Sequence, residues 1–126
     1  MSWDIYLTEE VDQWLHALAR TDSDSYLQTV LAIEVLEAEG PMLGRPLVDR
    51  VKGSRLHNLK ELRPGSAGDS EIRILFIFDP WRSAALLIAG DKSGDWNRWY
   101  REHVPIAEQR YVEYLAQRQL EEGDTQ

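Results

Sequence analysis

Residues 71–89 read EIRILFIFDPWRSAALLIA, and this stretch decides the fold. Branched and aromatic side chains fill positions 71–78, which is typical of a β-strand. Residues 79–82 contain Asp and Pro and predict a tight turn, because both residue types favour turns. The mostly apolar run 83–89 predicts a second strand in the centre of a sheet. Two strands joined by a short turn form an antiparallel hairpin, around which we expect the rest of the chain to be arranged.

Further strands are expected on either side of this hairpin. Residues 56–63 form one candidate, which the flexible Pro-Gly segment 64–68 connects to the hairpin. Trp3, Ile5 and Leu7 alternate with less apolar residues, which predicts a short N-terminal strand at the edge of the sheet. The sequence therefore predicts an antiparallel sheet of three to four strands.

A helix pair is expected between the N-terminal strand and the rest of the sheet. Thr8 is a suitable N-cap, and apolar side chains then recur at helical spacing. Residues 21–24 break this pattern and cap a second helix, which Gly40 and Pro41 end. These features predict two antiparallel helices.

The segments that flank the three central strands are less regular. Residues 41–54 are rich in Gly and Pro and predict a loop, with one short helical turn around 47–51. After the last strand, residues 96–101 predict a short helix. Pro105 suits the first position of a separate final helix.

This order of elements predicts an α+β fold: an N-terminal strand and helix pair, the antiparallel sheet and a C-terminal helix. We expect the helices to pack on one face of the sheet and to leave the other face available for binding. A chain of 126 residues corresponds to one domain. We expect residues 1–120 to form this domain and the polar residues 121–126 to be a disordered tail.

The composition excludes several classes of site. There are no cysteines, so disulfides, thiol catalysis and cysteine-ligated metals are excluded. The three histidines are isolated, and we expect no metal site. We find neither a secretory signal nor an apolar run of the roughly 20 residues that a membrane helix needs, which favours a cytoplasmic protein without membrane contact.

The charge is unevenly distributed. The net charge of −8 argues against a nucleic-acid partner. However, residues 1–40 contain nine acidic residues and one basic residue, whereas residues 41–103 contain eleven basic and eight acidic residues. Such a separation predicts a binding face and a solvated acidic face on one small domain. The alternative is that acidic helices simply carry more surface charge.

A group of charged residues follows the predicted strands: Lys60, Glu61, Arg63, Arg73 and Lys92. Because adjacent strands lie about 5 Å apart, we expect these side chains to converge on one sheet face. Arg73, within an apolar strand, needs either a carboxylate partner or an anionic ligand. One alternative is an internal ion pair with Glu61 or Asp91. The other is a cationic phosphate site with a carboxylate as general base.

Aromatic and basic residues are interleaved between positions 96 and 103, where WNRWYREH contains two Trp, one Tyr and two Arg. Such a mixture can stack on bases and bind phosphates. Alternatively, the aromatic side chains pack the helix onto the sheet while the arginines remain in solvent.

The sequence resembles a known family in these segments. They are the run PLVDRVKGSRLHNLKELRPG, the strand EIRILFIFD, the apolar strand that ends in GDK, and a helix rich in Glu and Tyr. Together they are similar to the RelE/HigB superfamily of type II toxins, in particular its HigB-like, phage-derived branch. The resemblance covers residues 1–118 in the order of elements and 46–115 in motif detail.

The resemblance implies a RelE-like fold and a toxin that cleaves mRNA on the translating ribosome without a metal or other cofactor. It also implies a cognate antitoxin, often of the helix-turn-helix type. Glu61, Arg63, Arg73 and Lys92 match recurring charged positions of this branch, and Lys60 lies beside them.

From this match we expect Arg73 to hold the scissile phosphate, with Arg63 and Lys92 adding positive charge and Glu61 or Lys60 acting as general base. The residues expected to bind RNA are Arg55, Arg98, Tyr100 and Arg101. One alternative is a binding module on the same scaffold, either a ParE-like gyrase inhibitor or an inactive antitoxin-binding protein. Another is an unrelated domain with a structural Arg73–Glu61 pair.

Overall fold

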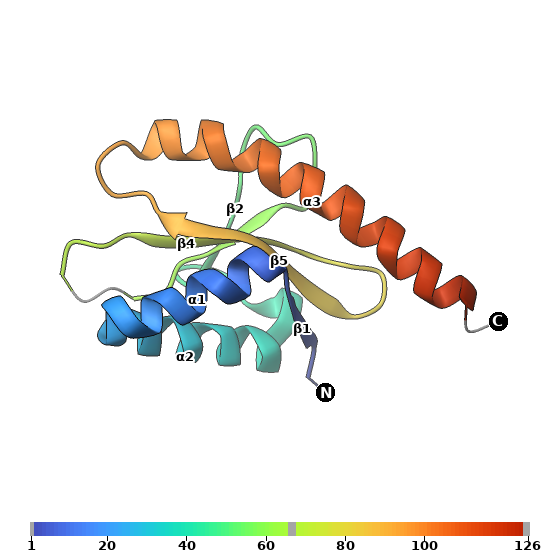
Figure 1. Cartoon of the computed structure of the whole chain (residues 1–126), viewed down its shortest axis with the longest axis horizontal. Coiled ribbons are helices and arrows are strands. Elements are labelled where there is room, and N and C mark those ends of the chain that lie inside the picture. The colour runs from blue at the N-terminus through green and yellow to red at the C-terminus, as the bar shows by residue number, and fades with distance from the viewer. Residues whose placement is uncertain (1, 66–67, 125–126) are drawn as a thin grey trace.

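A five-stranded mixed β-sheet forms the centre of the structure (Figure 1). The computed structural model describes residues 2–65 and 68–124. The strand order is β1-β5-β4-β3-β2; β1 runs parallel to β5, and the other neighbours are antiparallel. The strands are β1 (Asp4–Leu7), β2 (Val48–Arg50), β3 (Lys60–Leu62), β4 (Ile72–Phe78) and β5 (Ser83–Asp91). The predicted hairpin is the β4–β5 pair, and the predicted N-terminal strand lies at the sheet edge. The sheet differs from the expected antiparallel sheet of three to four strands, because residues 48–50 add a strand and β1 pairs with β5 in parallel.

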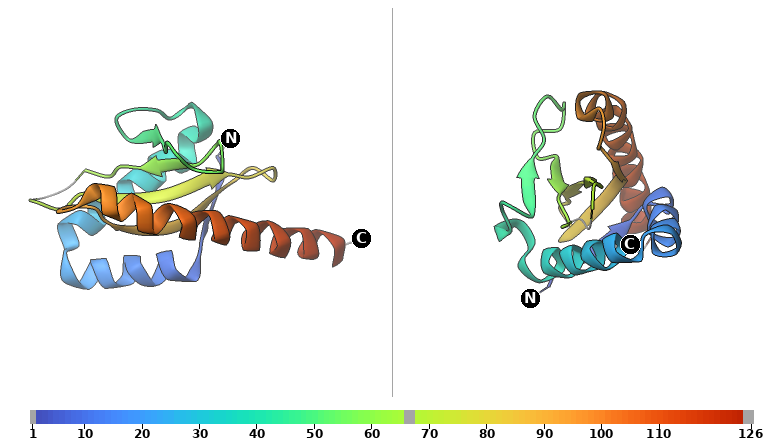
Figure 2. Two further views of the ribbon diagram at one scale, coloured as in Figure 1. Left: turned by 90° about the horizontal axis from the view of Figure 1, so that it is seen from above. Right: turned by 90° about the vertical axis from the view of Figure 1, so that its left-hand side faces the viewer.

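Helices cover both faces of this sheet (Figure 2). They are α1 (Glu9–Thr21), α2 (Ser23–Glu39), the 3₁₀ turn η1 (Gly40–Met42) and α3 (Trp96–Asp124). Ile74 and Phe76 belong to the core under α1 and α2, whereas Leu75 and Ile77 belong to the core under α3. The α+β class is confirmed, but the expectation that all helices share one face is wrong. The physical reason is that β4 is apolar at consecutive positions, as in strands that are buried on both sides.

The predicted helix pair is confirmed as α1 and α2. The Thr8 side chain caps α1 by accepting a hydrogen bond from the Val11 amide at 3.3 Å, and Asp22 caps α2 in the same way. Gly40 ends α2 with a φ of +59°, and a Cβ at this position would overlap the indole of Trp3. Glycine is therefore required here both for the backbone conformation and for the packing of Trp3.

The segment before β4 differs from the prediction. Residues 48–50 form the edge strand β2 instead of part of a loop or helical turn, and β3 is shorter than the predicted strand at 56–63. Between β2 and β3 the backbone forms a hydrogen bond within the loop, in which the Leu59 amide donates to the Leu56 carbonyl at 3.2 Å. Three-residue strands are too short to produce a clear alternation in sequence, which explains both differences.

The C-terminal segment is one long helix instead of two. α3 continues through Pro105, and residues 121–124 are helical where the sequence favoured a disordered tail; residues 125 and 126 lie outside the described part. An internal proline removes one helical hydrogen bond and strains the preceding turn. Packing on the sheet compensates for this cost, because Trp99, Ala107 and Tyr111 of α3 are buried in the core. In the described residues, no helix is long and apolar enough to cross a membrane.

Candidate active site

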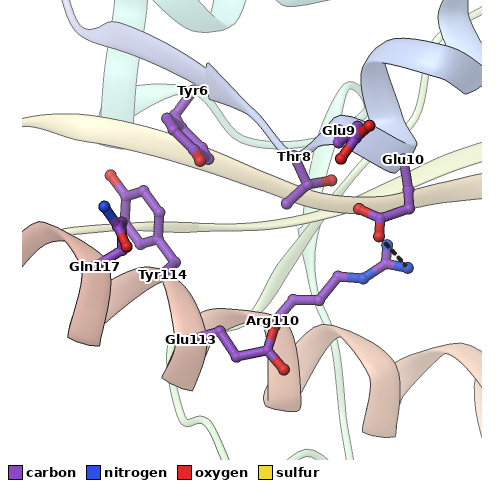
Figure 3. A pocket seen from close by; sticks show the side chains of 8 residues that line it. All are labelled: Tyr6, Thr8, Glu9, Glu10, Arg110, Glu113, Tyr114 and Gln117. Carbon is purple, nitrogen blue, oxygen red and sulfur yellow. Dashed lines mark ion pairs between the residues drawn. The ribbon is translucent and has the colours of Figure 1, made fainter.

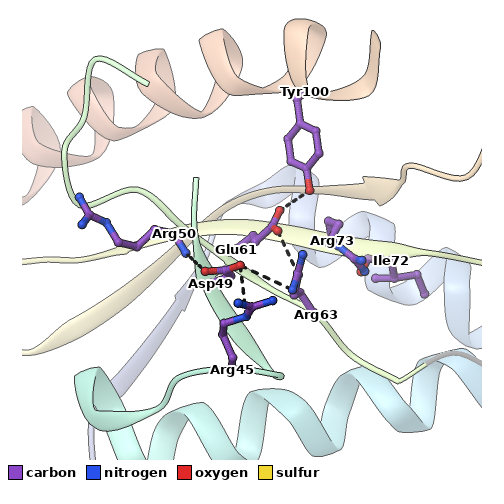
Figure 4. Close-up of polar contacts among 8 residues, drawn as sticks. All are labelled: Arg45, Asp49, Arg50, Glu61, Arg63, Ile72, Arg73 and Tyr100. Atoms are coloured by element: carbon purple, nitrogen blue, oxygen red, sulfur yellow. Dashed lines mark hydrogen bonds and ion pairs between the residues drawn. The ribbon is translucent and has the colours of Figure 1, made fainter. Parts of the chain in front are cut away.

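Charged and polar residues of β3, β4 and α3, and of the segments that follow β3 and β5, gather at the α3 face of the sheet; Figure 4 shows all of them except Lys92. This charged cluster consists of Glu61, Arg63, Arg73, Lys92 and Tyr100. Glu61 of β3 is opposite Leu75 of β4. Because Leu75 is two positions from Arg73 on the same strand, the side chains of Glu61 and Arg73 project from the same sheet face. Arg63 directly follows β3, Lys92 follows β5, and Tyr100 lies near the start of α3.

Glu61 is the buried acceptor at the centre of the charged cluster. It is 4% exposed and accepts hydrogen bonds from the Tyr100 hydroxyl at 2.5 Å and from Arg63 Nε at 3.1 Å. Arg63 Nη1 also lies 3.6 Å from Asp49 on β2. Burial raises the pKa of Tyr100, and the hydrogen bond to Glu61 raises it further. Tyr100 therefore keeps its proton at neutral pH and donates it in a hydrogen bond to a carboxylate.

Arg73 has no carboxylate partner within the described part of the chain. Its Nη1 donates to the carbonyl of Ile72 at 2.7 Å, and its buried Nε lacks a hydrogen-bond partner. The internal ion pair with Glu61 or Asp91, considered from the sequence, does not form among these residues. A buried donor without a partner is costly, and an anionic ligand is one group that could satisfy it.

Lys92 lies beside Arg73 on the same side of the sheet. Its Nζ is 5.5 Å from the ring centroids of both Trp96 and Tyr100. Partial burial lowers the pKa of Lys92, and the positive charge of Arg73 lowers it further. The structure thus brings two mutually repelling cations together next to Glu61, an arrangement that an anion would stabilise.

Lys60 does not join this cluster. It is opposite Phe76 in the β3–β4 register, and its Nζ lies 5.4 Å from the Phe78 ring on the α2 side of the sheet. The predicted convergence is therefore wrong for Lys60. The reason is the two-residue period of a strand, which places Lys60 and Glu61 on opposite faces.

Three of the four residues expected to bind RNA lie together in the structure. Tyr100 and Arg101 line a pocket together with Arg55 of the β2–β3 loop, whereas Arg98 is paired with Glu102 at 2.9 Å. Lys52 lines the same pocket and was not singled out in the sequence, where it is one of several bases in the loop. Among the described residues, no group of three or more His, Cys, Asp or Glu side chains could hold a metal ion.

A different pocket lies further along α3, between that helix and the β1–α1 junction (Figure 3). Three glutamates line it: Glu9, Glu10 and Glu113. Arg110 also lines it; this base is 3.5 Å from Glu10 and donates to the Leu87 carbonyl at 2.8 Å. The acidic surface of this pocket disfavours a phosphate group.

Comparison with known proteins gives consistent results. The model of the family described as "Phage derived protein Gp49-like" matches residues 13–112. A Mycobacterium tuberculosis protein named "Putative toxin HigB2" is 54% identical over 109 residues, 86% of this chain and 53% of the relative, so the chain spans about half of that protein. Another from the same organism, "Putative toxin HigB3", is 53% identical over 112 residues, 89% of this chain and 93% of the relative.

Two solved structures share the fold. A double mutant of the Escherichia coli toxin RelE, in its free state, superposes with a TM-score of 0.55 and 11% identity, over 76% of this chain and 90% of RelE. The YoeB dimer of Staphylococcus aureus superposes with a TM-score of 0.53 and 12% identity, over 68% of this chain and 92% of YoeB. These similarities confirm the RelE-like architecture expected from the sequence. The chain therefore belongs to the Gp49-like, HigB-type family within the RelE/HigB superfamily of toxins.

Proposed function

We propose that this protein is the toxin of a toxin–antitoxin pair and that it inhibits translation by cutting mRNA on the ribosome. The observation that carries the proposal is Arg73: a part-buried arginine whose buried Nε lacks a hydrogen-bond partner and which forms no ion pair among the described residues, beside Lys92 and on the same face as Glu61. Such a constellation suits a phosphodiester, whose transition state carries additional negative charge.

In the proposed reaction, the 2′-hydroxyl of one nucleotide attacks the adjacent phosphorus. Glu61 accepts the proton of the hydroxyl, and the bond from phosphorus to the 5′ oxygen breaks. Lys92, whose pKa is lowered by burial and by Arg73, donates a proton to the departing 5′ oxygen. The products are a 2′,3′-cyclic phosphate and a 5′-hydroxyl. Arg73 and Arg63 stabilise the negative charge on the non-bridging phosphate oxygens, a role that side-chain cations fill without a metal ion.

The hydrogen bonds of Glu61 are compatible with this role. Its two oxygens accept from different donors, Tyr100 on Oε2 and Arg63 on Oε1. A carboxylate has about four acceptor positions, so Glu61 can accept a substrate hydroxyl while both bonds persist. Tyr100 and Arg63 then act as groups that orient the base.

The acidic net charge does not conflict with an RNA substrate in this proposal. The acid-rich helices α1 and α2 cover the sheet face opposite the charged cluster. We propose that the ribosome supplies much of the free energy of RNA binding and that the reaction takes place in the cytoplasm. An antitoxin of the helix-turn-helix type, encoded beside the toxin, inhibits the activity in this proposal.

The proposal is tested by brief induction of the protein without an antitoxin, followed by mapping of mRNA 5′ ends. The wild type should stop growth and produce codon-phased cuts with 5′-hydroxyl ends. Arg73→Ala should reduce cleavage about 10²–10³-fold, the usual cost of removing one transition-state donor. Arg20→Ala, which removes an exposed base of α1, is the matched control and should cut like the wild type.

Full toxicity and cleavage by Arg73→Ala would contradict the proposal, provided that circular dichroism shows the same fold. Intact mRNA together with a DNA-damage response would instead support a gyrase inhibitor on the same scaffold.

A further inference from the structure

A second carboxylate faces the charged cluster from the edge strand β2. Asp49 is the direct cross-strand neighbour of Glu61 in the β2–β3 register, so both side chains project from the α3 face of the sheet (Figure 4). Like charges at directly opposite positions of neighbouring strands destabilise a sheet. Departures of this kind from the local rules of folding concentrate at functional sites, and this one lies beside the candidate active site.

Arg63 connects the two carboxylates. Its Nε donates to Glu61 Oε1 at 3.1 Å, and its Nη1 lies 3.6 Å from Asp49 Oδ2. The backbone at Arg63 is fixed as well, because its amide donates to the Leu47 carbonyl at 2.7 Å. The guanidinium is thus held at two points, while its Nη2 donates no hydrogen bond within the described part of the chain.

Asp49 is itself held in place by its neighbours. Its Oδ1 accepts from the Arg50 amide at 2.9 Å, and its Oδ2 lies 3.7 Å from Arg45 Nε in addition to its contact with Arg63. The Arg45 side chain is 76% exposed, whereas that of Arg63 is 27% exposed. Because solvent screens an exposed ion pair, the contact with Arg63 is the stronger of the two.

The contact with Asp49 determines how Arg63 uses its guanidinium. Without this contact, the guanidinium is free to rotate and to pair with Glu61 through two parallel hydrogen bonds, a favourable arrangement for an arginine and a carboxylate. That pair would occupy acceptor positions that Glu61 needs for the hydroxyl of the substrate. It would also direct the charge of Arg63 at Glu61 and away from the phosphate.

We propose that Asp49 is a positioning residue of the cleavage reaction: it holds Arg63 between two carboxylates, so that Glu61 keeps an acceptor position for the 2′-hydroxyl and Arg63 keeps a donor for the phosphate. This inference rests on the proposed function and adds to it a residue that acts through Arg63 without contacting the RNA.

The test is the steady-state rate of mRNA cleavage on translating ribosomes for Asp49→Asn, Arg63→Ala and the double variant. Asp49→Asn retains the oxygen that accepts from the Arg50 amide. It should lower kcat about tenfold, less than the roughly 10²-fold that misplacement of a catalytic group can cost, and should not raise KM. Arg63→Ala should lower kcat about 10²-fold. Adding Asp49→Asn to Arg63→Ala should cause no further loss, because Asp49 acts through Arg63.

The control is Asp12→Asn, which removes an exposed carboxylate of α1 and changes the net charge by the same amount. It should leave kcat and KM at their wild-type values. Circular dichroism and urea denaturation should show the same fold and the same midpoint for Asp49→Asn, Asp12→Asn and the wild type.

A second measurement reports the position of Arg63 without any cleavage. The Nε–H signal of Arg63 in ¹⁵N spectra of the full chain is assigned by its loss in Arg63→Ala. Hydrogen exchange of this group with water should be several-fold faster in Asp49→Asn than in the wild type, and unchanged in Asp12→Asn.

The outcomes separate this inference from the proposed function. A loss of kcat in Asp49→Asn that disappears in the Arg63→Ala background supports the role of Asp49. Wild-type kcat in Asp49→Asn, or losses that multiply in the double variant, would overturn this role and leave the proposed function intact. A wild type that cuts no mRNA would overturn the proposed function. In that case faster Nε–H exchange in Asp49→Asn would still support Asp49 as the residue that holds Arg63, and unchanged exchange would overturn that as well.

Discussion

Two tyrosines of α3, Tyr100 and Tyr114, make the same kind of hydrogen bond in very different surroundings. Tyr100 donates to Glu61, and Tyr114 donates to Asp79; the two tyrosines are 14 residues apart in sequence, about 21 Å along the helix. Arg63 is paired with Glu61 and Asp49, whereas Arg73 and Lys92, also near Glu61, form no ion pair among the described residues. Asp79 is instead enclosed in the β4–β5 turn, where it accepts from the backbone amides of residues 81 and 83 at 2.9 and 2.7 Å.

The comparison shows that the local environment decides what a tyrosine–carboxylate pair does. The hydrogen bonds that Asp79 accepts from the backbone stabilise the β4–β5 turn, and the bond from Tyr114 holds α3 against this turn. We call this group of contacts the latch. Trp81 strengthens this latch through a hydrogen bond from its Nε1 to Glu122 at 3.0 Å and stacking with Arg118. At Glu61 the same kind of pair lies beside Arg73 and Lys92, which form no ion pair among the described residues, as expected for a site that binds an anion.

The largest expected effect concerns the latch. Asp79→Ala leaves two backbone amides and the Tyr114 hydroxyl without their acceptor in a buried place, so the free energy of unfolding should fall by about 3 kcal/mol. Urea denaturation measures this change. Glu34→Ala, at an exposed position of α2, should remain within about 0.5 kcal/mol of the wild type. Equal stability of Asp79→Ala and the wild type would show that Asp79 is no latch.

A smaller effect is expected from the contact that places the start of α3. A Cβ at Gly90 would lie 2.7 Å from Trp99 Nε1, so Gly90→Ala must displace the Trp99 side chain next to Tyr100. We expect a loss of about 2 kcal/mol in thermal or urea unfolding. Gly44→Ala is the control, because nothing lies within 4 Å of its Cβ position. A Gly90→Ala protein that is as stable as Gly44→Ala would refute this packing argument.

The hydroxyls of Tyr100 and Tyr114 should have different roles, the first in cleavage and the second in stability. Tyr100→Phe should slow mRNA cleavage on ribosomes about tenfold, because Glu61 loses an orienting bond, with less than about 1 kcal/mol change in stability. Tyr114→Phe should lower stability by about 1–2 kcal/mol and leave the cleavage rate of the folded protein unchanged. If both variants changed the same quantity, the distinction between reactive and structural pairs would fail.

The smallest effect is the dependence of stability on alkaline pH. Burial and the hydrogen bond to Asp79 raise the pKa of Tyr114 above its usual value of 10.0. The unfolded chain therefore loses this proton at a lower pH than the folded chain, and the contribution of Tyr114 is complete below pH 10 and decreases above it. Unfolding titrations of the wild type and Tyr114→Phe should diverge by about 0.5 kcal/mol within half a pH unit above 10. Parallel titration curves would contradict this assignment.

Local patterns in the sequence predicted much of the fold. The β4–β5 hairpin, the N-terminal strand and the helix pair were predicted because apolar periodicity, caps and turn residues act over short distances. The side of the sheet on which α3 packs, and its continuity through Pro105, could not be predicted in this way. Both depend on contacts with strands far away in sequence, which override the local preference of proline.

The candidate site was predicted in part. Glu61, Arg63, Arg73 and Lys92 were identified from their charge and from the family resemblance, and the structure brings them together. Lys60 was included because the exact limits of a three-residue strand, and therefore its facing pattern, are not evident in sequence. The pocket at Lys52 and the latch at Asp79 were missed, because a loop base and a turn aspartate have no distinctive pattern until the fold places α3 beside them.

The most direct test of the account is to locate bound RNA on the protein in solution. Backbone amide chemical shifts of the ¹⁵N-labelled chain, titrated with an uncleavable 2′-O-methyl RNA hexamer, report binding even when it is weak. We predict shifts at Glu61, Arg73 and Lys92 and unchanged signals at Tyr114 and Glu10, in the acidic pocket. Shifts centred on that pocket, or saturating RNA without any shift at Arg73, would contradict the central claim that Arg73 and Lys92, beside Glu61, bind the RNA backbone.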